Sequence, residues 1–165
     1  MMGTATEYTL RRLLSELERK SELPELVFVN MTQTGTVSAS AGWVNEGTII
    51  PPSGYRYQLL VCELICDAPP GATSGRHAMQ FSYNNGIAGL YGEASYNTNL
   101  RYYHGEWYSA DLVALPSAAA SQTLFPAQFH LDVDNYLRLS YYNGTNADQT
   151  NSRIWRFIFL KYPLP

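Results

Sequence analysis

Apolar side chains recur with two different periods along this chain, and the first period indicates a helix near the N-terminus. Four leucines of the first 25 residues recur at the three- and four-residue spacing of one helix face: Leu10, Leu13, Leu14 and Leu17. Thr4 and Glu7 fit a capping box at the start of this helix, and Pro24 limits its end. The pattern therefore predicts an amphipathic helix within residues 1–25.

The leucine stripe of this helix needs a surface to cover it, because a helix of about 16 residues is only marginally stable alone. Three surfaces would serve: the chain's own β domain, a neighbouring subunit or larger assembly, and the seam of a helical trimer. The stripe is shorter than the three or four heptads typical of a coiled coil, which makes the trimer seam the weakest of the three. The helix is predicted either to pack on the β domain or to act as an arm that anchors or latches.

From residue 26 onward, apolar residues alternate with polar ones or form short runs, and clusters of Gly, Pro, Asn and Ser separate them. The predicted strands are 26–31, 36–41, 43–50, 55–67, 76–83, 107–115, 122–133, 136–142 and 153–162, with short strands and a long exposed loop in 87–106. Many strands without interleaved helices indicate a β sandwich or barrel, and the long middle connections favour a jelly roll. The sequence therefore predicts an all-β, jelly-roll-like antiparallel β sandwich over residues 26–165, preceded by the helical arm over 1–25.

The two strongest predicted strands, 55–67 and 153–162, are apolar on both faces. Such a strand is covered on both sides in a folded protein. Because a two-layer sandwich covers only one side, the second cover has to be another subunit or the helical arm. The residues predicted at an oligomer interface are Leu60, Leu64, Trp155, Phe157 and Phe159.

Charged residues make up 15% of the chain, against about 25% in typical soluble domains. Nine of the 25 charged side chains lie in the first 25 residues, so the surface of the β domain has to be built from neutral polar groups and tyrosine hydroxyls. This composition favours a protein that assembles with its own copies or with a partner. The net charge of −3 and the two lysines, Lys20 and Lys161, offer no basic patch, so nucleic-acid binding is not predicted.

No apolar run approaches the roughly 18 residues that span a bilayer, and the first residues lack the apolar core of a secretory signal peptide. We therefore expect a protein made in the cytoplasm, neither secreted nor inserted into a membrane. The two cysteines agree with this expectation. Cys62 and Cys66 would lie about 13 Å apart on a regular strand, whereas a disulfide needs Cα atoms about 4.4–6.8 Å apart, so both are predicted to be free thiols.

No motif for catalysis or cofactor binding stands out. The chain lacks a G-x-S-x-G nucleophile elbow and a glycine-rich phosphate loop, and neither cysteine has a histidine and an acid in a recognisable order. His130, Asp132 and Asp134 would share one face of a strand, but same-face neighbours are about 7 Å apart, so a solvent-facing edge is favoured over a metal site. We expect no enzymatic activity, no metal and no cofactor.

Aromatic residues are concentrated in the middle of the chain, and they offer a candidate binding surface: Tyr91, Tyr96, Tyr102, Tyr103, Trp107 and Tyr108. Exposed aromatic rings stack on sugars, which suggests a lectin-like or receptor-binding surface for a glycan. Tyrosine also suits protein interfaces, because it is apolar and able to form a hydrogen bond. Of the two interpretations, a protein interface is favoured.

Four segments of the β domain share a pattern with known proteins. They are a Pro/Gly turn that leads into a long apolar strand at 52–60 (PSGYRYQLL), the end of a small-residue loop with its strand at 75–81 (GRHAMQF), and the strands at 135–139 (NYLRL) and 153–158 (RIWRFI). Over roughly residues 48–162 this pattern resembles the jelly-roll domains of tailed-bacteriophage virion proteins, such as capsid decoration (cement) proteins and head fibres. The same order of strands suits a TNF- or C1q-like trimer.

The resemblance implies a non-enzymatic structural protein of the virion, which sits on a capsid as a decoration protein or is displayed from it as a fibre. It implies a homotrimer, with the major capsid protein or another virion protein as partner and the helical arm as anchor or latch. The family shares no catalytic residues, so none is expected here. Two alternatives stay open: a carbohydrate-binding module that recognises a host surface glycan through the aromatic residues, and a TNF- or C1q-like trimeric ligand.

Overall fold

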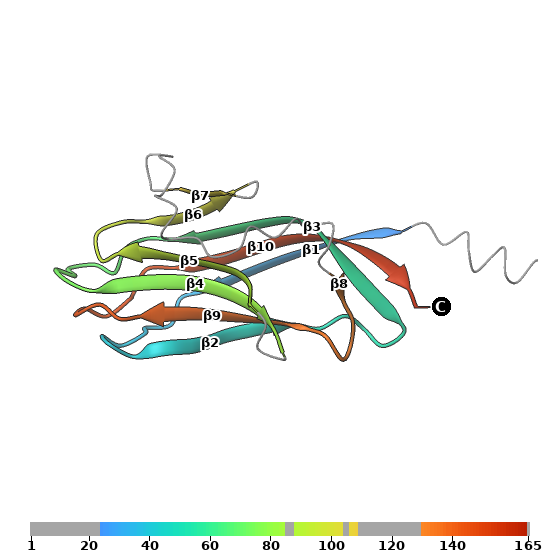
Figure 1. Ribbon diagram of the computed structural model, residues 1–165, viewed down its shortest axis with the longest axis horizontal. Helices are drawn as coiled ribbons and strands as arrows, with labels where there is room; N and C mark the ends of the chain where they lie inside the picture. Colours follow the sequence, from blue (N-terminus) through green and yellow to red (C-terminus); the bar gives the residue numbers. More distant parts are fainter. Residues whose placement is uncertain (1–23, 85–87, 104–105, 109–129, 165) are drawn as a thin grey trace, which may run out of the picture.

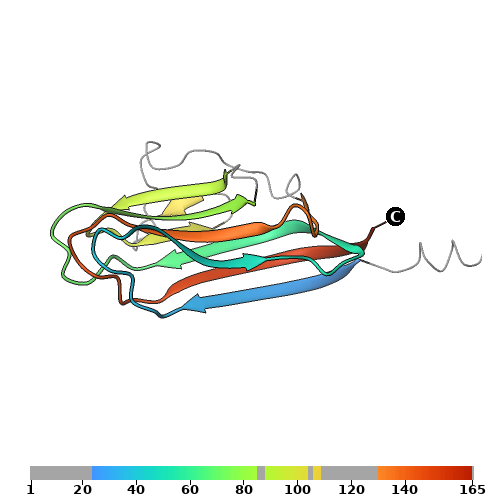
Figure 2. The same ribbon diagram turned by 90° about the horizontal axis from the view of Figure 1, so that it is seen from below.

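The computed structural model describes residues 24–84, 88–103, 106–108 and 130–164. These residues form two antiparallel β-sheets that pack face to face, with the strands along the long axis of the molecule (Figure 1 and Figure 2). None of the described residues is helical. The prediction of an all-β antiparallel sandwich is thereby confirmed, whereas the predicted helical arm with its leucine stripe lies outside the described residues.

The two sheets differ in size. The six-stranded sheet has the order β1-β10-β3-β6-β7, with β8 paired to another part of β3, and the four-stranded sheet has the order β2-β9-β4-β5. The strands are β1 Glu25–Gln33, β2 Gly42–Ile49, β3 Tyr55–Cys66, β4 Arg76–Tyr83, β5 Ala88–Ser95, β6 Leu100–Tyr103, β7 Glu106–Tyr108, β8 His130–Leu131, β9 Leu137–Asn143 and β10 Arg153–Pro163. At the majority of its connections the chain crosses from one sheet to the other, so consecutive strands usually belong to different sheets.

Most predicted strands lie within a residue or two of the observed ones, and 76–83 coincides with β4. Two predictions differ from the structure. Residues 36–41 form a turn instead of a strand, with one β-bridge between Val37 and Gln149. Of the predicted strand 122–133, the described part is paired only at His130–Leu131, because the chain turns at the next residue.

The long pairing of β3 with β10 forms the middle of the six-stranded sheet. Its inward side chains pack on the four-stranded sheet; Phe157, for example, lies edge-on to Phe81 of β4, with ring centroids 5.7 Å apart. A bulge places one extra residue, Leu60, between the pairs that Leu59 and Val61 make with β10. Leu60 and Val61 therefore both face outward, and the outer face of β3 is apolar at two consecutive positions.

Four of the five predicted interface residues belong to the core instead. Leu64, Trp155, Phe157 and Phe159 are at most 2% exposed. They alternate along β3 and β10 toward the four-stranded sheet, which covers them within one subunit. The prediction assigned these side chains to a partner, but the second sheet of the same chain already covers them. Only Leu60 lies on the outer surface.

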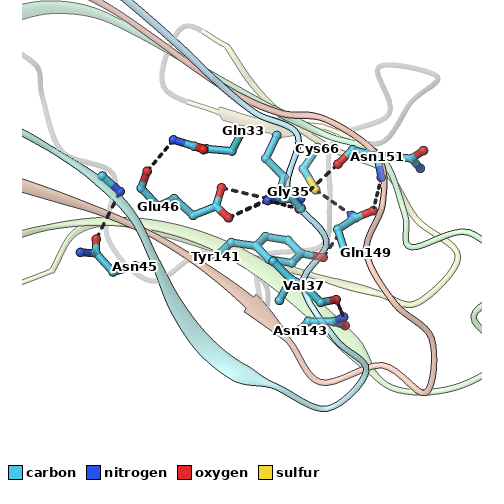
Figure 3. Close-up of polar contacts among 12 residues, drawn as sticks. Gln33, Gly35, Val37, Asn45, Glu46, Cys66, Tyr141, Asn143, Gln149 and Asn151 are labelled. Atoms are coloured by element: carbon cyan, nitrogen blue, oxygen red, sulfur yellow. Dashed lines mark hydrogen bonds and ion pairs between the residues drawn. The ribbon is translucent and has the colours of Figure 1, made fainter.

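A buried ion pair joins the two sheets near the end of β1 and the start of β10, and Figure 3 shows the polar contacts around it. Arg153 of β10 donates through Nε to both carboxylate oxygens of Glu46 of β2, at 2.9 Å each. The two side chains are only 2% and 3% exposed. Glu46 faces inward because a bulge between Asn45 and Gly47 inserts it as an extra residue in β2.

The loops around the ion pair make further hydrogen bonds at this end of the sandwich. The Arg153 guanidinium also donates to the carbonyl oxygen of Gly35, in the loop between β1 and β2. Asn143, at the end of β9, has its Nδ2 atom 3.0 Å from the carbonyl oxygens of Val37 and Ala147. These bonds hold the β1–β2 and β9–β10 loops against the sheets, where buried polar groups have to be paired.

Removing the charge balance of the ion pair is expected to cause a large loss of stability. Glu46→Gln keeps the size of the side chain but leaves the buried Arg153 guanidinium without an opposite charge, which costs about 3–5 kcal/mol. Urea unfolding followed by tryptophan fluorescence measures the free energy of unfolding. The control is Glu25→Gln, which breaks the exposed Glu25–Lys161 pair and is expected to change stability very little. Equal effects of the two substitutions would contradict a special role for the buried pair.

His77 of β4 is fully buried, and its surroundings favour the neutral form. Its Nε2 atom lies 2.7 Å from the carbonyl oxygen of Thr98, so Nε2 carries the proton, because a carbonyl oxygen only accepts. Burial lowers the pKa of His77 below its usual value of 6.5. As the pH falls below that value, the unfolded chain takes up a proton at this position before the folded protein does, so folding becomes less favourable.

Stability is therefore expected to decrease as the pH falls from about 7 to about 5, and His77→Gln is expected to flatten this dependence. Glutamine keeps a donor for the Thr98 carbonyl but does not titrate. Thermal unfolding at a series of pH values measures the effect, with His130→Gln, at an exposed histidine, as the control. If His77→Gln and the wild-type protein lose stability equally on acidification, another group is responsible.

Candidate functional site

Exposed apolar side chains gather on the outer face of the six-stranded sheet. Leu26 and Phe28 of β1 are 50% and 69% exposed, and their apolar neighbours on β3 and β10 are exposed or partly exposed. We call this surface the outer apolar face. Its residues are Leu26, Phe28, Leu60, Val61, Ile158 and Leu160.

Strand register makes the outer apolar face continuous across three strands. Phe28 pairs with Ile158, which pairs with Val61, so these side chains stand in one row across the sheet. Leu26 and Leu160 form the next pair along β1 and β10. Contact of such side chains with water is unfavourable, and a contiguous apolar patch marks a contact with another molecule.

Two groups of charged residues border the outer apolar face. In the row beside Phe28, Arg156 of β10 donates to Glu63 of β3 at 2.7 Å, so this pair adds no net charge to the face. At the other end, beyond Leu160, Arg56 of β3 lies over the ring of Tyr162 of β10, with Cζ 5.5 Å from the ring centroid.

Sequence reasoning identified only Leu60 on this face. The run 26–29 is apolar at four consecutive positions, and Val27 and Val29 pack against the core while Leu26 and Phe28 face outward. Alternation along a strand shows that half of such a run must point away from the core. This signal was available in the sequence, but it does not say which half is covered.

The outer face of the four-stranded sheet carries a pocket lined by aromatic, charged and glycine residues. We call it the aromatic pocket, and its volume is about 440 Å³. Its lining residues are Trp43, Gly75, Arg76, Tyr91, Glu93, Tyr142 and Gly144.

Strand register explains why these residues meet. Trp43 of β2 pairs with Tyr142 of β9, Tyr142 pairs with Ala78 of β4, and Ala78 pairs with Glu93 of β5. Ala78 in the middle of this row is small and fully buried. Tyr91, two residues before Glu93, shares its face. The Trp43 ring centroid lies 5.3 Å from that of Tyr142 and 6.0 Å from that of Tyr91.

Glu93 links the polar groups of the aromatic pocket. Its carboxylate accepts a hydrogen bond from Nη1 of Arg76 at 2.8 Å and another from the Tyr91 hydroxyl. Burial alone would raise the pKa of Glu93, but these hydrogen bonds and the Arg76 charge outweigh it, so the pKa lies below its usual value. Burial and the hydrogen bond to Glu93 raise the pKa of Tyr91. At neutral pH the Glu93 carboxylate is therefore ionised beside the charged Arg76 guanidinium, and the Tyr91 hydroxyl is neutral.

No family model, curated protein or solved structure matches this chain. In the part of the chain that the structure describes, no helix is long and apolar enough to cross a membrane. The outer apolar face and the aromatic pocket are the two candidate functional surfaces.

The predicted aromatic surface is divided between the two sheets. Tyr91 lies in the aromatic pocket, and Tyr96 is partly exposed in the loop after β5. Tyr102 is 4% exposed and belongs to the core, because its strand turns this position toward the four-stranded sheet; its assignment to a binding surface is therefore wrong. Three further residues lie on β6 and β7 of the six-stranded sheet, with side chains outside the described part: Tyr103, Trp107 and Tyr108.

Sequence reasoning missed Trp43 and Tyr142, the other two rings of the aromatic pocket. Each lies in a predicted strand, 43–50 or 136–142, and each alternates with inward residues like an ordinary strand position. Their separation in the sequence hides their contact, which only the pairing of β2 with β9 creates.

The possible metal ligands His130, Asp132 and Asp134 do not share one strand, because β8 ends at Leu131. Oδ1 of Asp132 accepts hydrogen bonds from the backbone N–H groups of Asn135 at 2.7 Å and Asp134 at 2.8 Å, so this carboxylate caps a turn. The same bonds lower the pKa of Asp132. Among the described residues, no group of three or more His, Cys, Asp or Glu side chains is placed to hold a metal ion.

Cys62 and Cys66 are free and buried, as their spacing on one strand predicted. Burial raises the pKa of the Cys62 thiol well above its usual value and that of the Cys66 thiol to about 12. Both thiols are therefore protonated at neutral pH, and neither supplies a thiolate for nucleophilic chemistry.

Proposed function

We propose that this chain is a structural virion protein of a tailed bacteriophage, a non-enzymatic capsid decoration (cement) or fibre component that forms a homotrimer through its outer apolar face. The observation that carries this proposal is the row of apolar side chains across β1, β10 and β3, with Phe28 69% exposed. Removing a phenylalanine side chain from water contributes about 1.5–3 kcal/mol of favourable free energy, so a partner that covers this face is bound more tightly.

The order of strand pairing supports a jelly-roll fold, which is the fold that the phage resemblance implies. The pairs β1–β10, β2–β9, β3–β6 and β4–β5 are nested within one another along the sequence. Nested pairs of this kind form one long antiparallel ribbon, and rolling that ribbon up produces two facing sheets. We therefore propose that the sandwich is a jelly roll.

A second copy of the same chain is the partner that best fits the outer apolar face. Arg156 and Glu63, which border the face, are already paired within the subunit, so this pair brings no net charge to the contact when identical faces approach. Symmetric homo-oligomers bury equivalent surfaces on every subunit, which places all copies of this patch in contact at once. The threefold symmetry in the proposal comes from the resemblance.

Phe28→Asp is expected to convert the trimer to a monomer, because it places a charge at the most exposed apolar position of the outer apolar face. Multi-angle light scattering at micromolar concentration measures the mass, which is three times 18.5 kDa for the proposed trimer. Val133→Asp, at an exposed apolar position on the loop between β8 and β9, is the matched control and should stay trimeric. A wild-type protein that is monomeric at this concentration would overturn the proposed assembly.

The N-terminal segment is proposed to anchor the trimer to the capsid. It leads into β1, whose residues Leu26 and Phe28 belong to the outer apolar face, so it joins the sandwich at the rim of the proposed interface. Its predicted leucine stripe then docks onto the major capsid protein or another virion protein.

Leu13→Ser/Leu17→Ser is expected to abolish binding to capsids while leaving the trimer intact, because it removes apolar residues from the docking face of the predicted helix. Co-sedimentation with capsids of the phage that encodes the chain measures binding, and light scattering measures the oligomeric state. Arg12→Ser/Glu16→Ser, on the polar faces of the same predicted helix, is the control.

Two results would count against this arrangement. Full-length protein that neither sediments with capsids nor occurs in purified particles would overturn the virion assignment. A monomeric Leu13→Ser/Leu17→Ser variant would instead place the leucines in the subunit interface.

A further inference from the structure

The aromatic pocket has the chemistry of a ligand site that the proposed structural role does not use. We propose that it binds a neutral sugar, with a pyranose ring stacked on Trp43 and its hydroxyl groups bonded to Glu93 and Arg76. The pocket lies on the outer face of the four-stranded sheet, and the outer apolar face lies on the six-stranded sheet, on the other side of the core. Subunits that assemble through the six-stranded sheet would therefore leave the pocket open.

Trp43 provides the stacking platform. Its side chain is 48% exposed, although an indole is among the largest apolar groups in a protein. Tyr142 and Tyr91 flank it and restrict its orientation. One face of a pyranose ring presents C–H groups, which pack favourably on the electron-rich face of an indole. Stacking a sugar there removes apolar surface of both partners from water.

Glu93 and Arg76 provide directional contacts for hydroxyl groups, which both donate and accept hydrogen bonds. The Glu93 carboxylate accepts. The Arg76 side chain is 73% exposed, and among the described residues its side chain bonds only to Glu93, through Nη1, which leaves other guanidinium N–H groups to donate. Because Arg76 and Tyr91 already hold the carboxylate in place, binding a sugar requires little further ordering of the site.

The charge balance of the pocket favours a neutral ligand over a charged one. Three aromatic rings beside a carboxylate also resemble a cage for a quaternary ammonium group, but the Arg76 guanidinium neutralises Glu93 and repels a cation. The Glu93 carboxylate in turn repels a phosphate group. The volume of about 440 Å³ lies within the range of small-ligand sites, about 300–1,000 Å³.

Two glycines of the pocket lining allow close packing around Tyr142. A Cβ atom on Gly144 would lie 2.5 Å from the hydroxyl oxygen of Tyr142, so any side chain there would displace this ring. Gly75 has a φ of +96°, and a Cβ atom there would overlap the carbonyl oxygen of Gly144. The position of the Tyr142 ring in the pocket therefore depends on glycine at both positions.

The experiment is a screen of the full-length protein against an array of neutral mono- and oligosaccharides, followed by calorimetric titration with the strongest ligand. Trp43→Ala is expected to weaken binding at least about tenfold, and Glu93→Ala to weaken it similarly, because each removes one of the two contact types. Tyr136→Ala, which removes a partly exposed aromatic ring outside the pocket, should bind like the wild-type protein. Thermal unfolding checks that every variant is folded.

No binding of any neutral sugar, or equal binding by the wild-type protein and Trp43→Ala, would overturn the proposal. Choline and inorganic phosphate are titrated separately, and tighter binding of either than of every sugar would also overturn it. Phe28→Asp distinguishes a failure of sugar binding from a failure of the proposed assembly, because the substitution lies outside the aromatic pocket. It is expected to bind the sugar with the affinity of one wild-type subunit even when it is monomeric.

Discussion

The buried contact between Arg153 and Glu46 is the constraint on which the rest of the sandwich depends. It connects β10, inside the six-stranded sheet, with β2, at the edge of the four-stranded sheet, and so fixes how the two sheets face each other. Charges with almost no exposure are tolerated only when they are paired and hydrogen-bonded. The bulge that turns Glu46 inward and the loop that brings the Gly35 carbonyl to the guanidinium both serve this requirement.

With the sheets fixed in this way, the two outer faces present different chemistry. The outer apolar face is a row of aliphatic and aromatic side chains with the Arg156–Glu63 pair at its border, which suits contact with another copy of the chain. The aromatic pocket combines clustered, tilted rings with a carboxylate and a guanidinium, which suits a small polar ligand. The proposed subunit contact and the proposed ligand site therefore lie on different sheets.

Local patterns predicted much of the sandwich. The predicted strand 76–83 coincides with β4, because Met79 and Phe81 face the core while Arg76 and Gln80 alternate with them toward the outer face. Leu64 and Trp155 were assigned to an interface because their strands are apolar on both faces, and local sequence does not say which face the second sheet covers. Residues 36–41 alternate like a strand, yet Asn143, about a hundred positions later, holds them as a turn through its bonds to their carbonyl oxygens.

The sequence by itself determined an all-β sandwich with free thiols and more apolar residues than one core can cover, because alternation, turn residues and cysteine spacing are local properties. Only the tertiary structure decided in which direction the surplus apolar side chains point and which side chains come into contact. A bulge in β3 turns Leu60 outward, and a bulge in β2 turns Glu46 inward. Trp43, Tyr91 and Tyr142 come from three different strands, and their contact depends on strand register, which no local pattern contains.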